Sequence, residues 1–335
     1  MIDKESLMRI KTTSALAVGG VLTLALAGCV ADSDDGGDGG DGDALVLGLV
    51  PSQDMDQLVE DADALAELLA EELDRDVEPY ITDNYAGLVT AMQTGQADIG
   101  MFGPIALVQA IDQADAEAVL QSVRYGSDTY VTQWFTNDPD TYCLDEPVMA
   151  ETGQGYEMLF CNGTDTAESG PVGEEALELI EEGETISFVD EGSASGYYYP
   201  ATQLEVLNGF DPLSDIDAQF AGGHPNSVLN VYNGEISIGV SFDDARESVV
   251  EEQEDVGDEV VVFAWSEDIP NDGIALAADL SDEEKQQITD GFLALTESEE
   301  GQEVLFDVYE IDDLVEANID ALDAARDVAA NFGDE

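Results

Sequence analysis

The side chains best suited to bind or react gather in residues 188–200, which read FVDEGSASGYYYP. A short apolar run at 186–189 has strand character, and it passes through small residues into a predicted helix at 195–207. A helix start leaves backbone N–H groups free and carries the positive end of the helix dipole, which suits an anion. Ser193 and Ser195 add hydroxyl donors. Because serine is also a favoured N-cap residue, an ordinary helix cap explains the same pattern.

Two further strand–helix junctions carry polar side chains in the same half of the chain. Residues 222–224 include His224, the one histidine of the sequence, and residues 241–244 include Asp243 and Asp244. Ligands of open α/β sheets sit beyond the carboxyl ends of the strands, so these junctions are predicted to converge on one cleft. His224 would then contact an anion, and the alternative is a neutral capping or core histidine.

Alternating strand and helix patterns position these junctions. Near-continuous apolar runs such as residues 44–50 indicate strands buried on both faces, and Ser281 with Glu284 has the spacing of a helix capping box. The alternation is typical of an α/β protein with parallel sheets. Residues 137–183 are rich in turn residues and interrupt the pattern, so two lobes are predicted. The C-terminus is predicted to form helices at 299–309 and 314–331.

The first 43 residues have the composition of an export signal and a tether. A basic start and a short apolar stretch end in Leu26-Ala27-Gly28-Cys29, which resembles the lipobox of secreted lipoproteins. Residues 1–29 are therefore predicted to be a signal peptide, with Cys29 lipidated; a plain signal peptide is the alternative. Residues 30–43 are rich in Asp and Gly and are predicted to be a flexible tether that holds the protein at the outer cell surface.

The turn-rich segment at 137–183 contains the two remaining cysteines, Cys143 and Cys161. An exported protein permits disulfides, so the two are predicted to close a local loop, and two reduced thiols are the alternative. Asn162 begins the sequence Asn-Gly-Thr, an acceptor pattern for N-glycosylation.

The charge of the chain is extreme. It has 77 Asp and Glu against 8 Lys and Arg, a net charge of −69, while 44% of residues are hydrophobic. Nucleic acid is excluded as a partner because phosphate contacts need basic side chains. Molar salt shortens the range of the repulsion between these charges to about 3 Å. We therefore interpret the acidity as a surface adapted to high salt. The basic residues beyond residue 29 are scattered, so an anion site is expected to rely on amides, hydroxyls, tyrosine or His224. These basic residues are Arg75, Arg124, Arg246, Lys285 and Arg326.

Five stretches together resemble the PhnD-like substrate-binding proteins of phosphonate, phosphite and phosphate ABC transporters. They are LVLGLVPSQD at 45–54, TDNYAGLVTAMQTGQADIGMFGP at 82–104, FVDEGSASGYYYP at 188–200, FAGGHPNSVLNVYNGE at 220–235 and IPNDG at 269–273. The resemblance implies a two-lobed α/β fold of the type II periplasmic-binding-protein kind, with two crossover segments near 130–135 and 260–265 as the hinge. Lobe 1 would comprise residues 44–132 plus 264–335, and lobe 2 residues 133–263, with an insertion around 137–183.

The same resemblance implies a ligand site. The oxyanion would sit on Ser193, Ala194, Ser195 and Gly196, and His224 and Tyr85 would contact it from either lobe. Ala194 stands where the family usually has Thr, and Phe102 where many members have Tyr, so two hydroxyl donors are missing. Asp243 or Asp244 matches an acidic ligand contact.

The function that follows is capture of phosphonate, phosphite or phosphate by a monomeric, lipid-anchored protein that delivers it to an ABC permease and its ATPase. No catalytic residue, metal or cofactor is predicted. Three alternatives stay open: a sensor subunit, a binding protein for another anion such as a sulfonate or organic acid, and an extracellular metal-dependent hydrolase. The sequence has no zinc-type cluster and no nucleophile motif, which disfavours the hydrolase.

Overall fold

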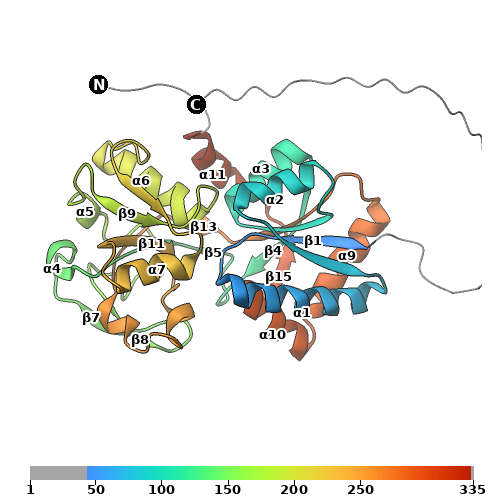
Figure 1. The fold of residues 1–335 in the computed structure, drawn as a ribbon, viewed down its shortest axis with the longest axis horizontal. Helices are drawn as coiled ribbons and strands as arrows, with labels where there is room; N and C mark the ends of the chain where they lie inside the picture. The colour runs from blue at the N-terminus through green and yellow to red at the C-terminus, as the bar shows by residue number, and fades with distance from the viewer. Residues whose placement is uncertain (1–43, 333–335) are drawn as a thin grey trace, which may run out of the picture. The chain divides into compact units, whose positions relative to one another are not determined.

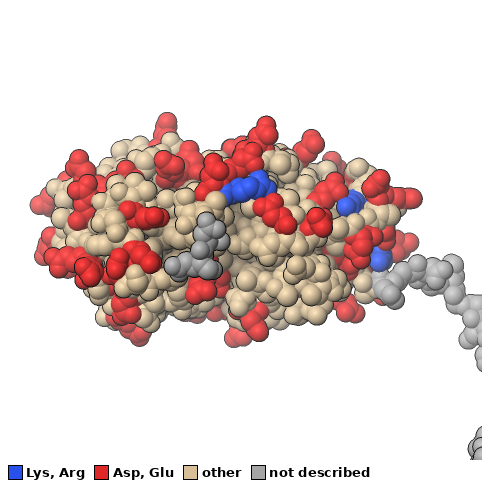
Figure 2. Space-filling model, turned by 90° about the horizontal axis from the view of Figure 1, so that it is seen from above, with Lys and Arg blue, Asp and Glu red and all other residues tan. Residues whose placement is uncertain are grey.

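The computed structural model describes residues 44–332 (Figure 1). The predicted signal peptide, lipid anchor at Cys29 and tether at 30–43 therefore all lie outside the described residues. Among residues 44–332, no helix combines the length and the apolar character that crossing a bilayer requires. In Figure 2, Asp and Glu cover much of the visible face, with few Lys or Arg among them.

The first sheet combines strands from both ends of the described chain, and we call the part built around it lobe 1. Its strand order is β15-β4-β14-β3-β1-β2, with β1, β2 and β3 parallel and β14 antiparallel to both of its neighbours. The α2 and α3 helices lie on one face, with α1 and α10 on the other (Figure 1). The strands are β1 (Leu45–Leu49), β2 (Val77–Ile81), β3 (Ile99–Phe102), β4 (Glu117–Val123), β14 (Gly273–Leu276) and β15 (Asp313–Glu316). The helices are α1 (Met55–Leu73), α2 (Tyr85–Gln93), α3 (Pro104–Ala114), α9 (Asp282–Leu295) and α10 (Glu299–Tyr309).

The second sheet comes from the middle of the chain, and we call the part around it lobe 2. Its seven strands follow the order β10-β9-β11-β6-β12-β8-β7. The strands are β6 (Thr132–Thr136), β7 (Val148–Glu151), β8 (Glu157–Phe160), β9 (Thr185–Phe188), β10 (Asp217–Phe220), β11 (Ile238–Phe242) and β12 (Val261–Trp265). The main helices are α6 (Tyr199–Asn208) and α7 (His224–Tyr232), and α4 (Pro139–Tyr142), α5 (Glu174–Leu177) and α8 (Val256–Glu259) are single turns. The two-lobed α/β architecture is as expected from the sequence.

The chain passes between the lobes at a short antiparallel pair, β5 (Thr129–Tyr130) with β13 (Ile269–Pro270). The sequence placed the crossovers near 130–135 and 260–265, but most of these residues form β6 and β12, which pair inside the second sheet. The reason is burial: Trp134, Phe135 and Phe263 have no solvent exposure and belong to the core of lobe 2.

The C-terminus also differs from expectation. Residues 313–316 form β15 instead of the start of a helix, because Leu314 is buried and the strand pairs with β4. Helix α11 (Ile319–Ala330) begins only after the cap residue Asn318. It packs on α3 in lobe 1, and Phe332 just beyond it contacts the rings of Tyr197 and Tyr198 in lobe 2.

The turn-rich segment at 137–183 adds β7 and β8 to the edge of the second sheet. The predicted Cys143–Cys161 disulfide is present, with Cα atoms 5.7 Å apart. The Asn162 side-chain nitrogen donates to the carbonyls of Tyr142 and Phe263, both at 2.9 Å. A glycan on that nitrogen would disturb these bonds, so we expect Asn162 to hold the loop.

Candidate functional site

A small cavity lies between the lobes and collects residues from both. A water molecule's centre can reach about 30 Å³ of it, so the space suits a ligand of few atoms. Lobe 1 and the crossing strands supply Val50, Ser52, Gln53, Tyr85, Gly103, Arg124, Tyr130, Asp272 and Tyr309, and lobe 2 supplies Ser193, Ala194, Ser195, His224 and Phe242. Of the residues predicted from sequence, the structure thus brings together Tyr85, Ser193, Ala194, Ser195 and His224.

The turn at Ser193 opens with one wide π-helical turn, Ala194–Tyr198, before α6 begins. The Ser193 hydroxyl accepts a hydrogen bond from the Gly196 N–H at 3.0 Å. Ser193 therefore caps the helix and also lies on the cavity wall. Gly196 itself does not line the cavity. A Cβ there would lie 2.4 Å from the Val189 Cβ, which explains the glycine. The N–H groups of Ala194 and Ser195 belong to the first turn, where a helix offers no internal acceptor.

His224 is buried and neutral. Its Nδ1 lies 2.7 Å from the Ser241 hydroxyl, and its backbone N–H donates to the Ser52 carbonyl of lobe 1 at 2.9 Å. Burial, assisted by the positive charge of Arg124, lowers the pKa of His224 to about 3. The ring can therefore offer either an N–H or a lone pair, according to whether Ser241 donates or accepts.

Arg124 is the residue that sequence reasoning missed, and the expectation of a site without a basic side chain is wrong. It is 7% exposed and lies over the rings of Phe242 and Tyr130, at 4.7 and 5.7 Å from their centroids. Its Nη2 pairs with Glu310, whereas its Nε is buried without a hydrogen-bond partner. Burial lowers the pKa of Arg124, but the carboxylates of Glu310 and Asp272 outweigh this, so the guanidinium stays charged.

The acidic residue on the cavity wall is Asp272, in place of the predicted Asp243 or Asp244. Burial raises the pKa of Asp272 to about 6, with Arg124 opposing the rise and Glu310 adding to it. Its backbone carbonyl accepts from the Ser122 N–H at 2.9 Å, which fixes its position. Asp272 follows β13 and belongs to the IPNDG stretch at 269–273, which resembles the family, although the sequence analysis gave this aspartate no role.

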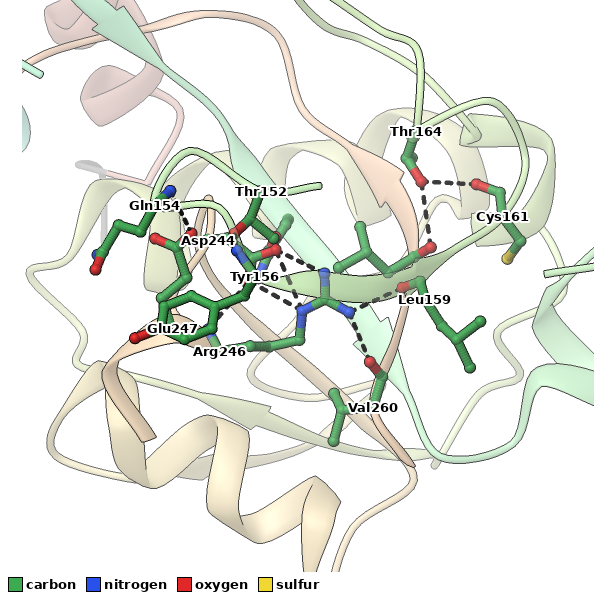
Figure 3. Close-up of polar contacts among 12 residues, drawn as sticks. Thr152, Gln154, Tyr156, Leu159, Cys161, Thr164, Asp244, Arg246, Glu247 and Val260 are labelled. Carbon is green, nitrogen blue, oxygen red and sulfur yellow. Dashed lines mark hydrogen bonds and ion pairs between the residues drawn. The ribbon is translucent and has the colours of Figure 1, made fainter. Parts of the chain in front are cut away.

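Asp243 and Asp244 have other partners. Asp243 accepts from the Val131 N–H at 3.0 Å and lines a separate pocket beside the crossing strands. Asp244 pairs with Arg246, whose Nε and Nη2 reach its carboxylate at 2.9 and 2.6 Å (Figure 3). Arg246 also donates to the carbonyls of Leu159 and Val260, and it is fully buried. This ion pair thus joins the 137–183 segment to the sheet and leaves Asp244 unavailable to a ligand.

Phe102 does not line the cavity. It is 1% exposed in the core of lobe 1, where its ring covers Gly100, and Gly103 takes the place beside the cavity. Tyr85 does line it, as the first residue of α2, which Asn84 caps by accepting from the Gly87 N–H at 2.8 Å. Burial raises the pKa of Tyr85 well above its usual value, so the phenol remains a neutral donor.

The lobes touch around the cavity. Gly192 of lobe 2 packs directly against Tyr85 of lobe 1, where a Cβ would meet the tyrosine Cβ at 2.5 Å. Gln109 on α3 also donates to the Tyr198 hydroxyl at 3.3 Å. With the His224–Ser52 bond, these contacts describe a closed arrangement in which the cavity is screened from bulk water.

Comparisons with known proteins identify the family and the fold of the chain. Residues 47–322 match the family described as ABC transporter, phosphonate, periplasmic substrate-binding protein. The phosphate-import protein PhnD of Mycolicibacterium smegmatis is 25% identical over 68% of the chain, and the chain spans only 64% of that relative's length. The phosphonates-binding periplasmic protein of Escherichia coli is 21% identical over 78% of the chain and 69% of its own length.

Two solved structures share the fold. A binding-protein component of a phosphonate ABC transporter from Pseudomonas aeruginosa matches with a TM-score of 0.68 at 20% identity, over 86% of each chain. PhnD1 of Prochlorococcus marinus in complex with methylphosphonate matches with a TM-score of 0.69 at 16% identity, over 86% of this chain and 98% of that one.

Proposed function

This chain belongs to the family of periplasmic phosphonate-binding proteins of ABC transporters, and from that premise we propose that it captures a phosphonate, phosphite or phosphate between its lobes. The ligand would be passed to an ABC permease driven by its ATPase. The observation that carries the proposal is the buried Arg124 Nε without a partner, on the same cavity as the Ser193–Ser195 turn.

The cavity supplies donors from several directions. The Ala194 and Ser195 N–H groups, with the Ser193 and Ser195 hydroxyls, would bind oxygens from the lobe 2 side. The Tyr85 hydroxyl and the Arg124 Nε would bind from lobe 1, and a charged donor makes the stronger bond. Closure of the lobes removes competing water and strengthens each of these bonds.

Several finer assignments belong to the same proposal. The protein would be a monomer anchored to the outer surface through Cys29, with residues 30–43 as its tether and a surface adapted to high salt. Lobe 1 and lobe 2 would move against each other about the crossing strands β5 and β13 when the ligand binds. A sensor subunit would use the same cavity, and a neighbouring permease gene would favour transport.

Calorimetric titration of the purified protein in molar salt with phosphate, phosphite, methylphosphonate, aminoethylphosphonate and sulfate tests the proposal. One-to-one binding of one phosphorus oxyanion is expected. Ser193→Ala, Ser195→Ala and His224→Ala should each weaken it about 10–150-fold, as loss of a hydrogen bond to a charged group costs about 1.5–3 kcal/mol. Unchanged affinity in all three variants, or no binding by the folded protein, would remove the proposed site.

A further inference from the structure

The lobes also touch at the end of the described chain, outside the ligand cavity. Helix α11 belongs to lobe 1, because Leu322 and Ala325 are buried in the core of that lobe. Arg326 of the same helix forms an ion pair with Asp112 on α3 at 3.2 Å. The helix lies beside the crossing strand β13 and the π-helical turn of lobe 2 (Figure 1). The end of α11 therefore extends from a fixed base in lobe 1 toward lobe 2.

Phe332, two residues beyond α11, packs against the core of lobe 2. Its ring centroid lies 5.5 Å from that of Tyr198, in an edge-to-face arrangement at 84°, and 6.1 Å from that of Tyr197. Tyr197 is buried and also contacts the rings of Phe188 and Phe220, both in lobe 2. Phe332 thus extends an aromatic cluster of lobe 2, although the helix that holds it belongs to lobe 1.

This aromatic cluster lies directly behind the turn that faces the ligand cavity. The π-helical turn Ala194–Tyr198 begins with Ala194 on the cavity wall and ends with the two tyrosines. The Tyr198 N–H donates to the Ser193 carbonyl at 3.1 Å, which joins the two ends of the turn. A group that holds the two tyrosine rings in place therefore also holds the amides that we propose to bind the oxyanion.

The contact of Phe332 with lobe 2 requires the closed arrangement. Gln109 on α3 donates to the Tyr198 hydroxyl at 3.3 Å, so two side chains of lobe 1 meet the same ring of lobe 2. Because α3 and α11 are fixed to lobe 1, movement of the lobes about β5 and β13 would separate Phe332 from both tyrosines. Opening would then expose apolar surface that closure buries, which is unfavourable in water.

On the basis of the proposed function, we propose that Phe332 is a latch that stabilises the closed form and slows release of the ligand. It is a positioning residue, because it acts through Tyr197 and Tyr198 and does not itself line the cavity. Each aromatic pair changes an equilibrium constant about 2–12-fold. Loss of both pairs should therefore weaken ligand binding about 5–150-fold.

The test compares Phe332→Ala with the wild-type protein in molar salt. The ligand is phosphate, phosphite or methylphosphonate, whichever the wild type binds most tightly. Calorimetric titration measures the affinity, and stopped-flow tryptophan fluorescence measures the two rate constants. The latch forms only after the ligand has entered, so the release rate constant should rise about 5–150-fold, and the association rate constant should stay within about threefold of wild type.

Phe220→Ala is the matched control. The Phe220 ring contacts the same Tyr197 ring, with centroids 5.4 Å apart, but it does so from β10 inside lobe 2. This contact is present whether the lobes are open or closed. The control should lower the free energy of unfolding without ligand and keep the affinity within about threefold of wild type. Phe332→Ala should show the opposite pattern, with little change in unfolding and a clear loss of affinity.

The outcomes separate this inference from the proposed function. Wild-type affinity and release in Phe332→Ala would overturn the latch and leave oxyanion binding in place. Equal losses of affinity in Phe332→Ala and Phe220→Ala, or a loss carried by slower association, would overturn it too, because the aromatic cluster would then only support the fold or the entry of the ligand. If the folded wild type binds none of the three anions, the proposed function itself fails and the latch with it.

Discussion

Replacing Gly192 with alanine should weaken ligand binding without weakening the fold. Gly192 lies in lobe 2 and faces Tyr85 of lobe 1, and an added Cβ would stand 2.5 Å from the tyrosine Cβ. Ordinary contact between carbon atoms is about 3.5–4.0 Å. The Tyr85 Cβ is fixed to the backbone of α2 and cannot rotate away. The methyl group is therefore accommodated only if the lobes separate by about 1 Å or more at this point.

The loss of affinity can be estimated because the clash exists only in the closed form of the protein. Overpacking by one methyl group costs about 1–3 kcal/mol, and the open form escapes this because Gly192 and Tyr85 are then apart. A penalty of about 1–3 kcal/mol on the closed form corresponds to about a 5–150-fold loss of affinity. The free energy of unfolding without ligand should change by less than about 1 kcal/mol, because the unliganded protein relaxes by opening.

Calorimetric titration with methylphosphonate and denaturant unfolding without ligand would measure the two quantities. Gly223→Ala is the matched control, since Gly223 also faces lobe 1 but its added Cβ would meet the Gln53 carbonyl at 3.4 Å, an ordinary contact. Gly223 has φ −168°, extended backbone that alanine adopts freely. The control should bind within about threefold of wild type. Wild-type affinity in Gly192→Ala, equal losses in both variants, or a loss of unfolding free energy as large as the binding loss would refute the reasoning.

Two further predictions concern buried charges. Arg246→Met should lower the free energy of unfolding by about 3–5 kcal/mol, because it leaves the Asp244 carboxylate buried and unpaired, whereas Arg326→Met breaks exposed ion pairs and should cost no more than about 1 kcal/mol. Denaturant unfolding measures both, and equal costs would contradict the structural role of Arg246. His224 contributes stability in its neutral form, which is complete above pH 6.5 and is lost as the pH falls toward its lowered pKa of about 3. The excess stability of wild type over His224→Gln should accordingly shrink below pH 6.5 and be flat above it, and a difference that is constant across pH would argue against a buried neutral ring.

Much of the fold could be predicted because its signals are local. The capping box of Ser281 and Glu284 forms as its spacing indicated, with the Ser281 hydroxyl accepting from the Glu284 N–H at 3.2 Å. The Ser193 cap likewise joins residues three apart, and the Cys143–Cys161 disulfide closes a loop of 18 residues. Apolar periodicity and capping hydrogen bonds involve neighbours in the chain, so the sequence carries the information directly.

Non-local pairing explains where sequence reasoning failed. Residues 313–316 look compatible with a helix, but they pair with β4, almost 200 positions earlier, and become a strand. For the same reason the first crossover lies earlier than expected and the second later, at β5 and β13, because the residues expected there form β6 and β12, which pair inside one sheet. Pairing of distant strands depends on which sheet edge is free in the folded chain. A local sequence pattern does not contain this information.

The residues of the candidate site likewise fall into two groups, those that the sequence indicated and those that only the structure brought together. The sequence by itself pointed to the serine turn and His224, because each lies at the start of a helix after a strand, and the family resemblance added Tyr85. Only the tertiary structure decided that Arg124 and Asp272, 148 positions apart, line the same cavity. It also decided that Asp244 forms an ion pair with Arg246 and so has no bond to offer a ligand. The charge and hydrogen-bonding demand of a side chain depend on which distant groups bury and pair with it, and these neighbours are chosen by the packing of the whole chain.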